Sequence, residues 1–123
     1  MPAPTEIRLL KDRRALRVAF GEEVHTISAE LLRVESPSAE VQGHDPSQKV
    51  VVAGKRRVEI IGVEPVGNYA VRLRFDDLHS TGIYTWDLLE RMGREGDAMM
   101  AAYERALAER GLSRDPAPLP PRV

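Results

Sequence analysis

The chain has 123 residues, no cysteine, 30% charged residues and a formal net charge of −1. A single domain is expected at this length, and the absence of cysteine excludes disulfides, thiolate zinc sites, iron–sulfur ligation and cysteine nucleophiles. A charge near zero, no apolar run long enough for a bilayer and no apolar signal segment near Met1 together predict a cytoplasmic protein that binds neither nucleic acid nor membrane.

Three short strands and a helix are predicted in the first third of the chain. Apolar residues alternate over Ile7–Leu10 and Leu16–Phe20, and Val24–Ile27 is a further short apolar piece. Ser28 is a typical N-cap for a helix of about two turns over Ala29–Val34, which a nearby proline ends. The N-terminal third is therefore expected to contain strands followed by one helix.

The middle of the chain combines a long polar connection with a predicted hairpin. The connection runs from Glu35 to Lys49, and loops of this length are uncommon in compact domains and are often functional. Val50–Ala53 is a β-branched run, Gly54–Arg57 is a basic turn, and Val58–Val63 has the composition of a returning strand. We therefore expect Val50–Ala53 and Val58–Val63 to pair.

The clearest strand pattern of the sequence lies between Tyr69 and Phe75. A tight turn is predicted just before it at Pro65–Asn68, because proline fixes φ and Gly67-Asn68 tolerate positive φ. Apolar residues then alternate with basic residues, which is typical of a half-buried strand: Tyr69, Val71, Leu73 and Phe75 are expected inside, and Arg72 and Arg74 outside. The polar segment Asp76–Ser80 interrupts this pattern and is expected to form a loop.

The last third is predicted to be helical. Thr85 can cap a helix over Trp86–Met92 that stops at Gly93, and Asp97 can cap a second helix that runs to about Arg110. Met99, Met100, Tyr103, Ala106 and Leu107 supply an apolar stripe on that second helix. The remaining residues, 113–123, form a proline-rich tail that we expect to be disordered, with Pro118–Arg122 similar to a polyproline ligand.

These elements predict an α+β domain, a two-layer sandwich with a mostly antiparallel sheet and a few helices. The domain is expected over residues 1–95, with residues 96–112 as a C-terminal helix packed on it. All six aromatic residues are expected in the core, which leaves no stacking platform for nucleic acid: Phe20, Tyr69, Phe75, Tyr84, Trp86 and Tyr103.

Two segments of the sequence resemble a known family. They are AELLRVESPSAEVQGH at residues 29–44, and EPVGNYAV at residues 64–71 continuing through Phe75-Asp76-Asp77 to HSTGIYTW at residues 79–86. Together they resemble the gamma-butyrobetaine hydroxylase-like N-terminal domain, a bacterial domain of unknown function, over roughly residues 5 to 95. The family is found alone in short bacterial proteins, in front of the 2-oxoglutarate oxygenase domain of carnitine-pathway hydroxylases, and attached to Mrp-type iron–sulfur carrier ATPases.

The resemblance implies a structural zinc in the hydroxylases that this chain cannot reproduce. In those enzymes three cysteines and one distant histidine hold the metal. The cysteine positions fall on Ser36, Ser38 and Val41 of this sequence, and the histidine position falls on His79. Because three of the four ligands are missing, no metal and no cofactor is expected, and the loops are expected to close through hydroxyl and amide hydrogen bonds.

Catalytic motifs are incomplete throughout the sequence. No histidine begins the His-x-Asp/Glu motif of an iron oxygenase. Ser36 or Ser38 with His79 and Asp76 or Asp77 imitates a Ser-His-Asp set, but no nucleophile elbow surrounds either serine. Gly54-Lys55 lacks the other residues of a Walker loop. We therefore expect no enzymatic activity, with a small enzyme that uses His79 and the paired aspartates as the remaining enzymatic alternative.

Our functional prediction is a non-enzymatic protein-interaction or adaptor module with an unknown protein partner. The alternative, which rests on the family resemblance, is an accessory to metal or iron–sulfur cluster delivery that acts by docking to a carrier, or a zinc-less relic of a structural metal domain. The chain is expected to be a monomer or a weak homodimer. The predicted interaction surface comprises Gln42, His44, Asp76, Asp77 and His79, and a basic group at Lys55, Arg56 and Arg57 that either binds an acidic partner or is merely solvated.

Overall fold

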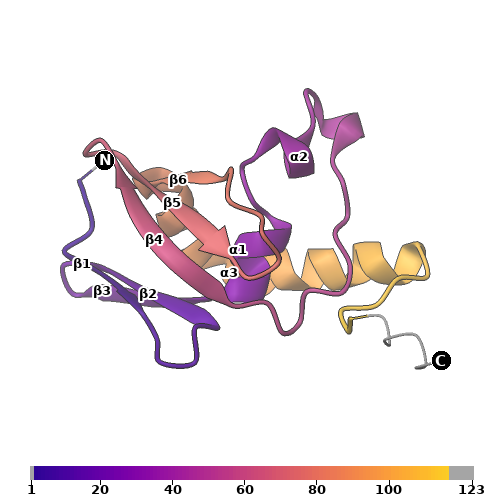
Figure 1. The fold of residues 1–123 in the computed structure, drawn as a ribbon, viewed down its shortest axis with the longest axis horizontal. Helices are drawn as coiled ribbons and strands as arrows, with labels where there is room; N and C mark the ends of the chain where they lie inside the picture. Colours follow the sequence, from indigo (N-terminus) through magenta and orange to yellow (C-terminus); the bar gives the residue numbers. More distant parts are fainter. Residues whose placement is uncertain (1, 117–123) are drawn as a thin grey trace.

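Two small antiparallel sheets and a long helix make up the computed structural model, which describes residues 2–116 (Figure 1). The first sheet contains β1 (Glu6–Leu9), β2 (Ala15–Phe20) and β3 (Glu23–Ser28), in that order. These strands agree with the predicted ones. In the central strand, Leu16 and Val18 are fully buried, as the alternation of apolar residues predicts.

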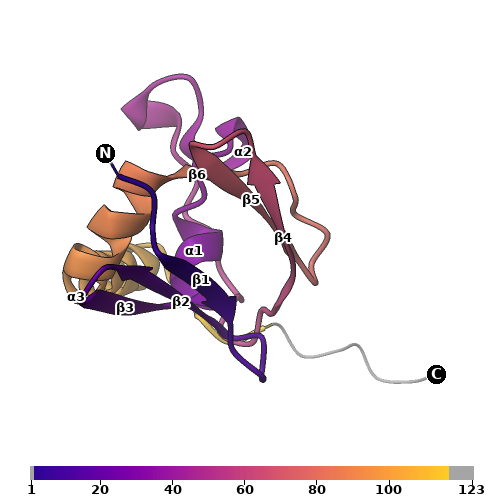
Figure 2. The same ribbon diagram turned by 90° about the vertical axis from the view of Figure 1, so that its left-hand side faces the viewer.

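The second sheet contains β4 (Ile60–Val66), β5 (Ala70–Phe75) and β6 (Ile83–Thr85), also in chain order. All strand pairs in both sheets are antiparallel, so the α+β class with antiparallel strands is confirmed. The strands are divided between two sheets, where the sequence leads us to expect one. A backbone hydrogen bond from the Ile60 N–H to the Arg13 carbonyl, 2.8 Å long, joins the start of the second sheet to a turn of the first (Figure 2).

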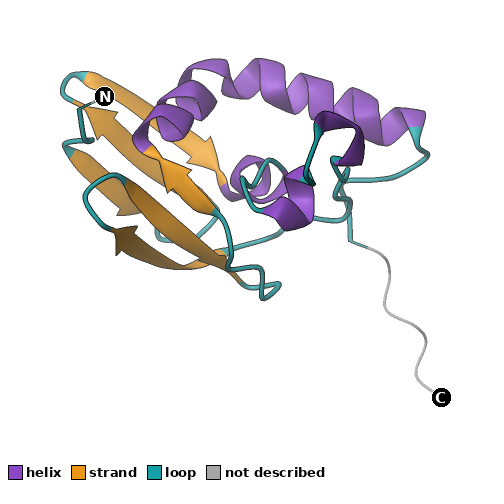
Figure 3. Cartoon of the chain, turned by 90° about the horizontal axis from the view of Figure 1, so that it is seen from above, coloured by secondary structure: helices purple, strands orange, loops and turns teal. Residues whose placement is uncertain are grey.

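Three α-helices and one 3-10 turn complete the structure. The helices are α1 (Ala29–Val34), α2 (Ala39–Gln42) and α3 (Trp86–Glu109), and the 3-10 turn is η1 (Pro46–Gln48). Ser28 and Thr85 cap α1 and α3 with their hydroxyl oxygens, as predicted. The long α3 lies beside both sheets and continues past them (Figure 3).

The core lies between the two sheets and the helices. Buried residues from both sheets and from α1 and α3 form one continuous cluster, which includes Leu16, Val18, Ile60, Leu73, Phe75, Tyr84, Leu32, Leu89 and Met92. A smaller cluster of Val34, Tyr103 and Leu107 lies where the C-terminal half of α3 covers the segment at residues 51–53. The second cluster extends the core beyond the sheets.

The predicted hairpin between Val50–Ala53 and Val58–Val63 is wrong. Residues 49–59 contain no strand, and β4 begins only at Ile60, where it pairs with β5. The basic turn at Gly54–Arg57 is held instead by the C-terminal segment, because the Gly54 and Arg56 N–H groups donate to the carbonyls of Ser113 and Arg114. The β-branched run at Val50–Ala53 is thus left without a partner strand.

The turn before β5 lies later than predicted. Pro65 belongs to β4, where it is opposite Val71, and only Gly67–Tyr69 form the turn. Since β4 is an edge strand, a proline without an N–H is tolerated there. Tyr69 is 53% exposed, so its predicted core position is wrong, and the fully buried Ala70 follows it.

The predicted break between two C-terminal helices is also wrong, because α3 is continuous from Trp86 to Glu109. Glycine in a helix interior costs about 1 kcal/mol relative to alanine. Gly93 is nevertheless suited to its place, because a Cβ there would collide with the His25 ring of β3. The glycine therefore allows close packing of helix on sheet rather than ending the helix.

The first residues of the predicted tail are anchored. Arg114 donates to both carboxylate oxygens of the buried Glu30, at 2.7 and 2.9 Å, and also pairs with Glu104. The proline-rich motif at residues 118–122 lies outside the described residues. Among residues 2–116, no helix has both the length and the apolar character that crossing a bilayer requires.

Candidate functional site around His79

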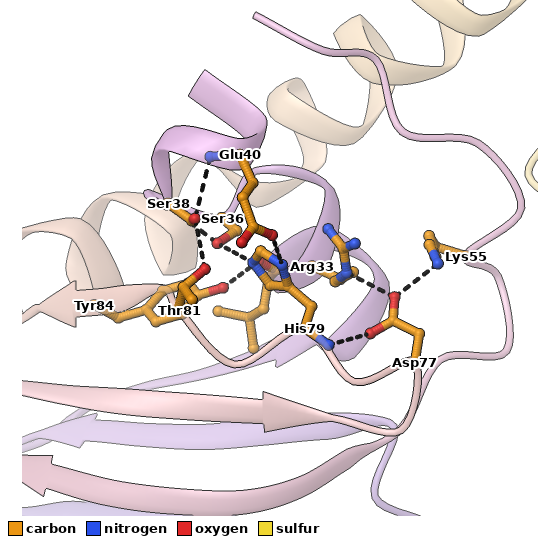
Figure 4. A network of polar contacts seen from close by, with 10 residues as sticks. Arg33, Ser36, Ser38, Glu40, Lys55, Asp77, His79, Thr81 and Tyr84 are labelled. Atoms are coloured by element: carbon orange, nitrogen blue, oxygen red, sulfur yellow. Dashed lines mark hydrogen bonds and ion pairs between the residues drawn. The ribbon is translucent and has the colours of Figure 1, made fainter. Parts of the chain in front are cut away.

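His79 joins two parts of the chain that are far apart in sequence. It lies in the loop between β5 and β6, and its ring faces the connection between α1 and α2 (Figure 4). Its Nε2 is 2.9 Å from the Ser36 Oγ, and its Nδ1 is 3.1 Å from the Glu40 Oε2. The His79 side chain is only 2% exposed and Ser36 is fully buried, so this contact closes one end of the domain.

The connection between α1 and α2 is fixed around Ser36 by further hydrogen bonds. The Ser38 N–H donates to the Ser36 Oγ at 3.3 Å, and the Gln42 Nε2 donates to the Ser36 carbonyl at 2.9 Å. The Ser38 and Thr81 hydroxyls are 2.7 Å apart and link the two loops a second time. Gly82 completes the closure, because a Cβ at that position would lie 2.5 Å from the Ser36 Oγ.

Tyr84 lies next to this contact, in the middle of β6. Its hydroxyl donates to the Leu32 carbonyl at 2.5 Å, which satisfies a carbonyl of α1. Burial raises the pKa of Tyr84 well above its usual range, so the phenol stays protonated and remains a donor. The hydrogen bond from the Tyr84 hydroxyl to the Leu32 carbonyl is therefore made between neutral groups.

Asp77, in the same loop as His79, is bound by charged side chains from two other parts of the chain. Its Oδ2 lies 2.7 Å from both the Arg33 Nε and the Lys55 Nζ, and its Oδ1 accepts the His79 N–H at 3.1 Å. Burial alone would raise the pKa of this carboxyl, but the hydrogen bonds from Lys55, the His79 N–H and Arg33 outweigh it and lower the pKa to about 2. Asp77 therefore stays ionised and joins three segments of the chain.

The His79 ring is held in its neutral form. Burial lowers its pKa, and the nearby Arg33 lowers it further, while Glu40 and Asp77 act in the opposite direction. A neutral imidazole has one donor and one acceptor nitrogen. Donation from Nδ1 to the Glu40 carboxylate leaves Nε2 to accept the Ser36 hydroxyl proton, which satisfies both nitrogens.

The residues at the zinc positions of the resembling hydroxylases do not fit a metal. Val41 is buried and offers no donor atom, and the hydroxyls of Ser36 and Ser38 are already used in hydrogen bonds. In residues 2–116, no group of three or more histidine, cysteine, aspartate or glutamate side chains is placed to hold an ion. Zinc prefers four nitrogen or sulfur donors, and this site supplies one.

The hydrogen bonds among Ser36, His79 and Glu40 follow the order of a hydrolase triad, but a substrate cannot reach the serine. Asp76 and Asp77 were the predicted acidic partners, whereas the structure places Glu40 on the His79 Nδ1. A substrate cannot reach Ser36, because this residue is fully buried and Gly82 packs against its Oγ. Neither Ser36 nor His79 lines the cavities of about 550, 340 and 270 Å³ found among the described residues. The arrangement therefore clamps two loops together and is not open for nucleophilic attack.

Four of the predicted surface residues, Lys55, Arg57, Asp76 and Asp77, line one hollow together with Gly54, Val58 and Pro116. His44 and Arg57 are exposed, Arg56 pairs with Asp115 at 2.6 Å, and Asp76 accepts the Glu59 N–H at 3.0 Å. Gln42 and Lys55 are half-buried and are used in the contacts described above. Some residues of the predicted interaction surface therefore make contacts that hold the fold together.

The sequence analysis missed Leu78, the most exposed large apolar residue of the described chain. Leu78 is 86% exposed and has a φ of 73°, a left-handed conformation that side-chain-bearing residues rarely adopt. It lies between Asp77 and His79, both of which are fixed by the contacts described above. The polar turn composition of Asp76–Ser80 marks a loop but gives no signal for an apolar residue at its tip.

Comparisons with known proteins identify relatives of this chain. A family model described as gamma-butyrobetaine hydroxylase-like, N-terminal, matches residues 7–90. One protein with an NMR solution structure is 44% identical, with a TM-score of 0.83 and coverage of 100% of this chain and 98% of its own. A second NMR structure is 38% identical, with a TM-score of 0.80 and coverage of 100% and 95%.

A crystal structure from Acidithiobacillus ferrooxidans adds a third relative. It shows a protein of unknown function in the DUF971 family that is 40% identical, with a TM-score of 0.60 and coverage of 73% of this chain and 91% of its own. No curated protein matches this chain. Since the family model covers more than half of the residues, the protein belongs to the gamma-butyrobetaine hydroxylase-like N-terminal domain family.

Proposed function

We propose that this protein is a non-enzymatic interaction module that docks another protein through the loop at residues 76–81. The observation that carries the proposal is Leu78, an 86% exposed leucine in a left-handed backbone conformation. That conformation costs roughly 1–2 kcal/mol for a residue with a side chain. Burial of a leucine side chain against a partner contributes about 1.5–3 kcal/mol, which exceeds this cost.

The loop is built to present Leu78 in one position. Asp77 on one side is bound by Arg33 and Lys55, and His79 on the other side is bound by Ser36 and Glu40. A loop that is already ordered loses little conformational entropy on binding, and this improves affinity. An apolar residue between two fixed polar residues is therefore a suitable anchor for a protein contact.

A catalytic role is less well supported by the same geometry. The serine–histidine–carboxylate group of Ser36, His79 and Glu40 is closed, and the hydrogen-bonding capacity of its histidine is fully used. A cysteine-free chain also suits the reducing cytoplasm, where we propose that it acts. Docking to a metal or iron–sulfur carrier is the alternative form of this function, and the identity of the partner would distinguish it from a general adaptor role.

The test is affinity capture from the source cells, quantified by mass spectrometry, with matched variants. Leu78→Gly removes the anchor and also relieves the left-handed backbone, so it should lose specific partners while its melting temperature stays equal or rises. Tyr69→Ser, at the exposed turn before β5, is the control and should retain the same specific partners as the wild type. Recovery of the same partners in equal amounts by wild type and Leu78→Gly would contradict the proposal.

A further inference from the structure

The segment Val50–Ala53 has the composition of a strand but no partner strand. Three valines and an alanine follow η1, and β-branched residues favour extended backbone. Figure 1 shows this part of the chain running without a helix or strand from η1 towards the start of β4. An unpaired extended segment is a ready template for pairing with another chain.

Backbone hydrogen bonds engage every second residue of this segment. The Val50 N–H donates to the Val41 carbonyl at 2.7 Å, the Val52 carbonyl accepts the Tyr103 hydroxyl at 2.5 Å, and the Gly54 N–H donates to Ser113 at 2.9 Å. Within residues 2–116, neither the N–H nor the carbonyl of Val51 and Ala53 has a hydrogen-bond partner. The Val52 N–H also lacks one.

This alternation is the pattern of a sheet edge. In an extended chain, alternate residues direct their backbone polar groups to opposite sides. One side of the segment is tied to α2, α3 and the C-terminal segment, and the other side is open. The N–H and carbonyl groups of Val51 and Ala53 could together form several backbone hydrogen bonds with an added strand.

A groove of about 550 Å³ lies beside the start of this segment, on its α3 side, and Val51 is the residue of the open edge that lines it. Its lining includes Val50 and Val51 on one side and Met99, Ala102 and Ala106 of α3 on the other. Val50 is 49% exposed, so the groove has an accessible apolar wall. The bonds from Val50 to Val41 and from Tyr103 to Val52 hold the segment in place, so the edge needs no ordering before it binds.

The charges at the groove favour an acidic occupant. Glu35, which lines it, is neutralised by Lys49 at 2.7 Å. Arg110, which also lines it, has no carboxylate partner among the described residues, and its guanidinium bonds only to the Ala106 carbonyl. Arg110 near the start of the segment and the exposed Arg57 beyond its end are therefore complementary to an added segment with carboxylates at both ends.

Two other occupants fit less well. Antiparallel pairing with the same edge of a second copy would bring Lys49 of one copy opposite Lys55 of the other; each is already paired with a carboxylate of its own chain, so this pairing supplies no carboxylate to Arg110. The chain's own C-terminus carries proline at positions 118, 120 and 121, and proline has no N–H to donate.

We propose that the Val51–Ala53 edge binds an extended segment of another protein, β-branched at its centre and acidic at its ends, by adding it as a strand. This site is separate from the loop at residues 76–81. The inference holds whether or not Leu78 contacts a partner.

The experiment uses the full chain labelled with ¹⁵N and the synthetic peptide Glu-Glu-Val-Thr-Val-Thr-Val-Glu-Glu. In the free protein, the amides of Val51 and Ala53 should exchange with solvent far faster than those of Val50 and Gly54. Adding the peptide should shift the NMR signals of the Val51 and Ala53 amides and slow their exchange with solvent. The same peptide with N-methyl groups on its valines and threonines should bind at least about tenfold more weakly, since two or more hydrogen bonds are lost. A peptide with lysine in place of glutamate should also bind more weakly.

Four results would overturn the proposal. The first is that the amides of Val51 and Ala53 are protected from exchange without peptide at every protein concentration, and the second is that this protection appears only as the protein associates with itself. The third is equal binding of the N-methylated peptide, and the fourth is no binding of the acidic peptide at millimolar concentration. The first two point to the chain's own residues or to a second copy as the occupant. Because the peptide itself is varied, the result does not depend on whether a protein variant folds.

Discussion

The loops around His79 and the segment Val50–Ala53 differ in how many of their polar groups have hydrogen-bond partners within the described residues. Around His79, the ring nitrogens, the Ser36 hydroxyl and the Asp77 carboxylate all have partners inside the molecule. Along Val50–Ala53, the backbone groups of every second residue have none. Buried polar groups are mostly paired within the chain, with the Arg33 Nη1 beside Asp77 as an exception here, whereas groups left unpaired at a surface remain available to a partner.

The same contrast exists between adjacent residues of one loop. His79 is fixed inside, while Leu78 beside it extends into solvent. We propose that the buried contacts supply rigidity and that the exposed residues supply recognition. If this division is correct, changes in the first group should mainly lower stability, and changes in the second should mainly lower binding.

The largest expected effect is that of His79→Ala. This change leaves a cavity beside Phe75 and removes the partner of the buried Ser36 hydroxyl. Loss of packing and of one buried hydrogen bond should lower the free energy of unfolding by about 3 kcal/mol, measured by urea denaturation. His44→Ala, at an exposed histidine in the same half of the domain, should change it by less than about 0.5 kcal/mol. Equal effects of the two changes would show that the His79 contact is not the closure described here.

Gly82→Ala should have the next largest effect. A Cβ at this position lies 2.5 Å from the Ser36 Oγ, so the two loops must separate to accept it. Overpacking of this kind costs about 2 kcal/mol in unfolding free energy. Ser36→Ala in the same chain removes the colliding oxygen, so the double variant should lose less stability than the sum of the two single variants. Strict additivity would contradict direct contact between these positions.

A smaller effect is expected from pH. Because burial lowers the pKa of His79 in the folded state, the unfolded chain binds a proton more readily as the pH falls below about 6.5, and stability declines from there down to the folded pKa. Asp77, whose pKa is lowered to about 2, contributes stability that is lost only between about pH 4 and pH 2. Urea denaturation from pH 8 to pH 5 should therefore show a decline in wild type that is reduced in His79→Gln. An equally steep decline of stability in the variant would mean that the pH dependence comes from the titration of another group.

The sequence predicted the local features well because short-range chemistry determines them. The caps at Ser28 and Thr85 and the buried positions of β2 follow from hydroxyl geometry and a period of two. The failures at Val50–Ala53 and Gly93 both involve distant partners. Strand pairing depends on which segment lies alongside, and the helix continues through Gly93 because β3 packs against it.

The site was predictable only in part for the same reason. Ser36 and His79 were expected to be neighbours from the family resemblance, and the structure places them 2.9 Å apart. Glu40, rather than Asp76 or Asp77, proved to be the carboxylate on His79, because α2 folds back over the loop. The exposure of Leu78 depends on how the whole loop is oriented, and no pattern of sequence spacing reports it.

The smallest expected effect on stability distinguishes the two sides of the open edge. Val51→Pro removes an N–H that has no partner in the described residues and reduces a side chain that packs partly against Val34, Tyr103 and Leu107, so unfolding free energy should fall by about 1 kcal/mol or less. Val50→Pro removes the 2.7 Å hydrogen bond to the Val41 carbonyl and should cost at least about 1 kcal/mol more. Both values come from the same urea denaturation series. Equal losses for the two variants would mean that Val51 donates its N–H within the folded chain, and the edge would then be closed to any added strand.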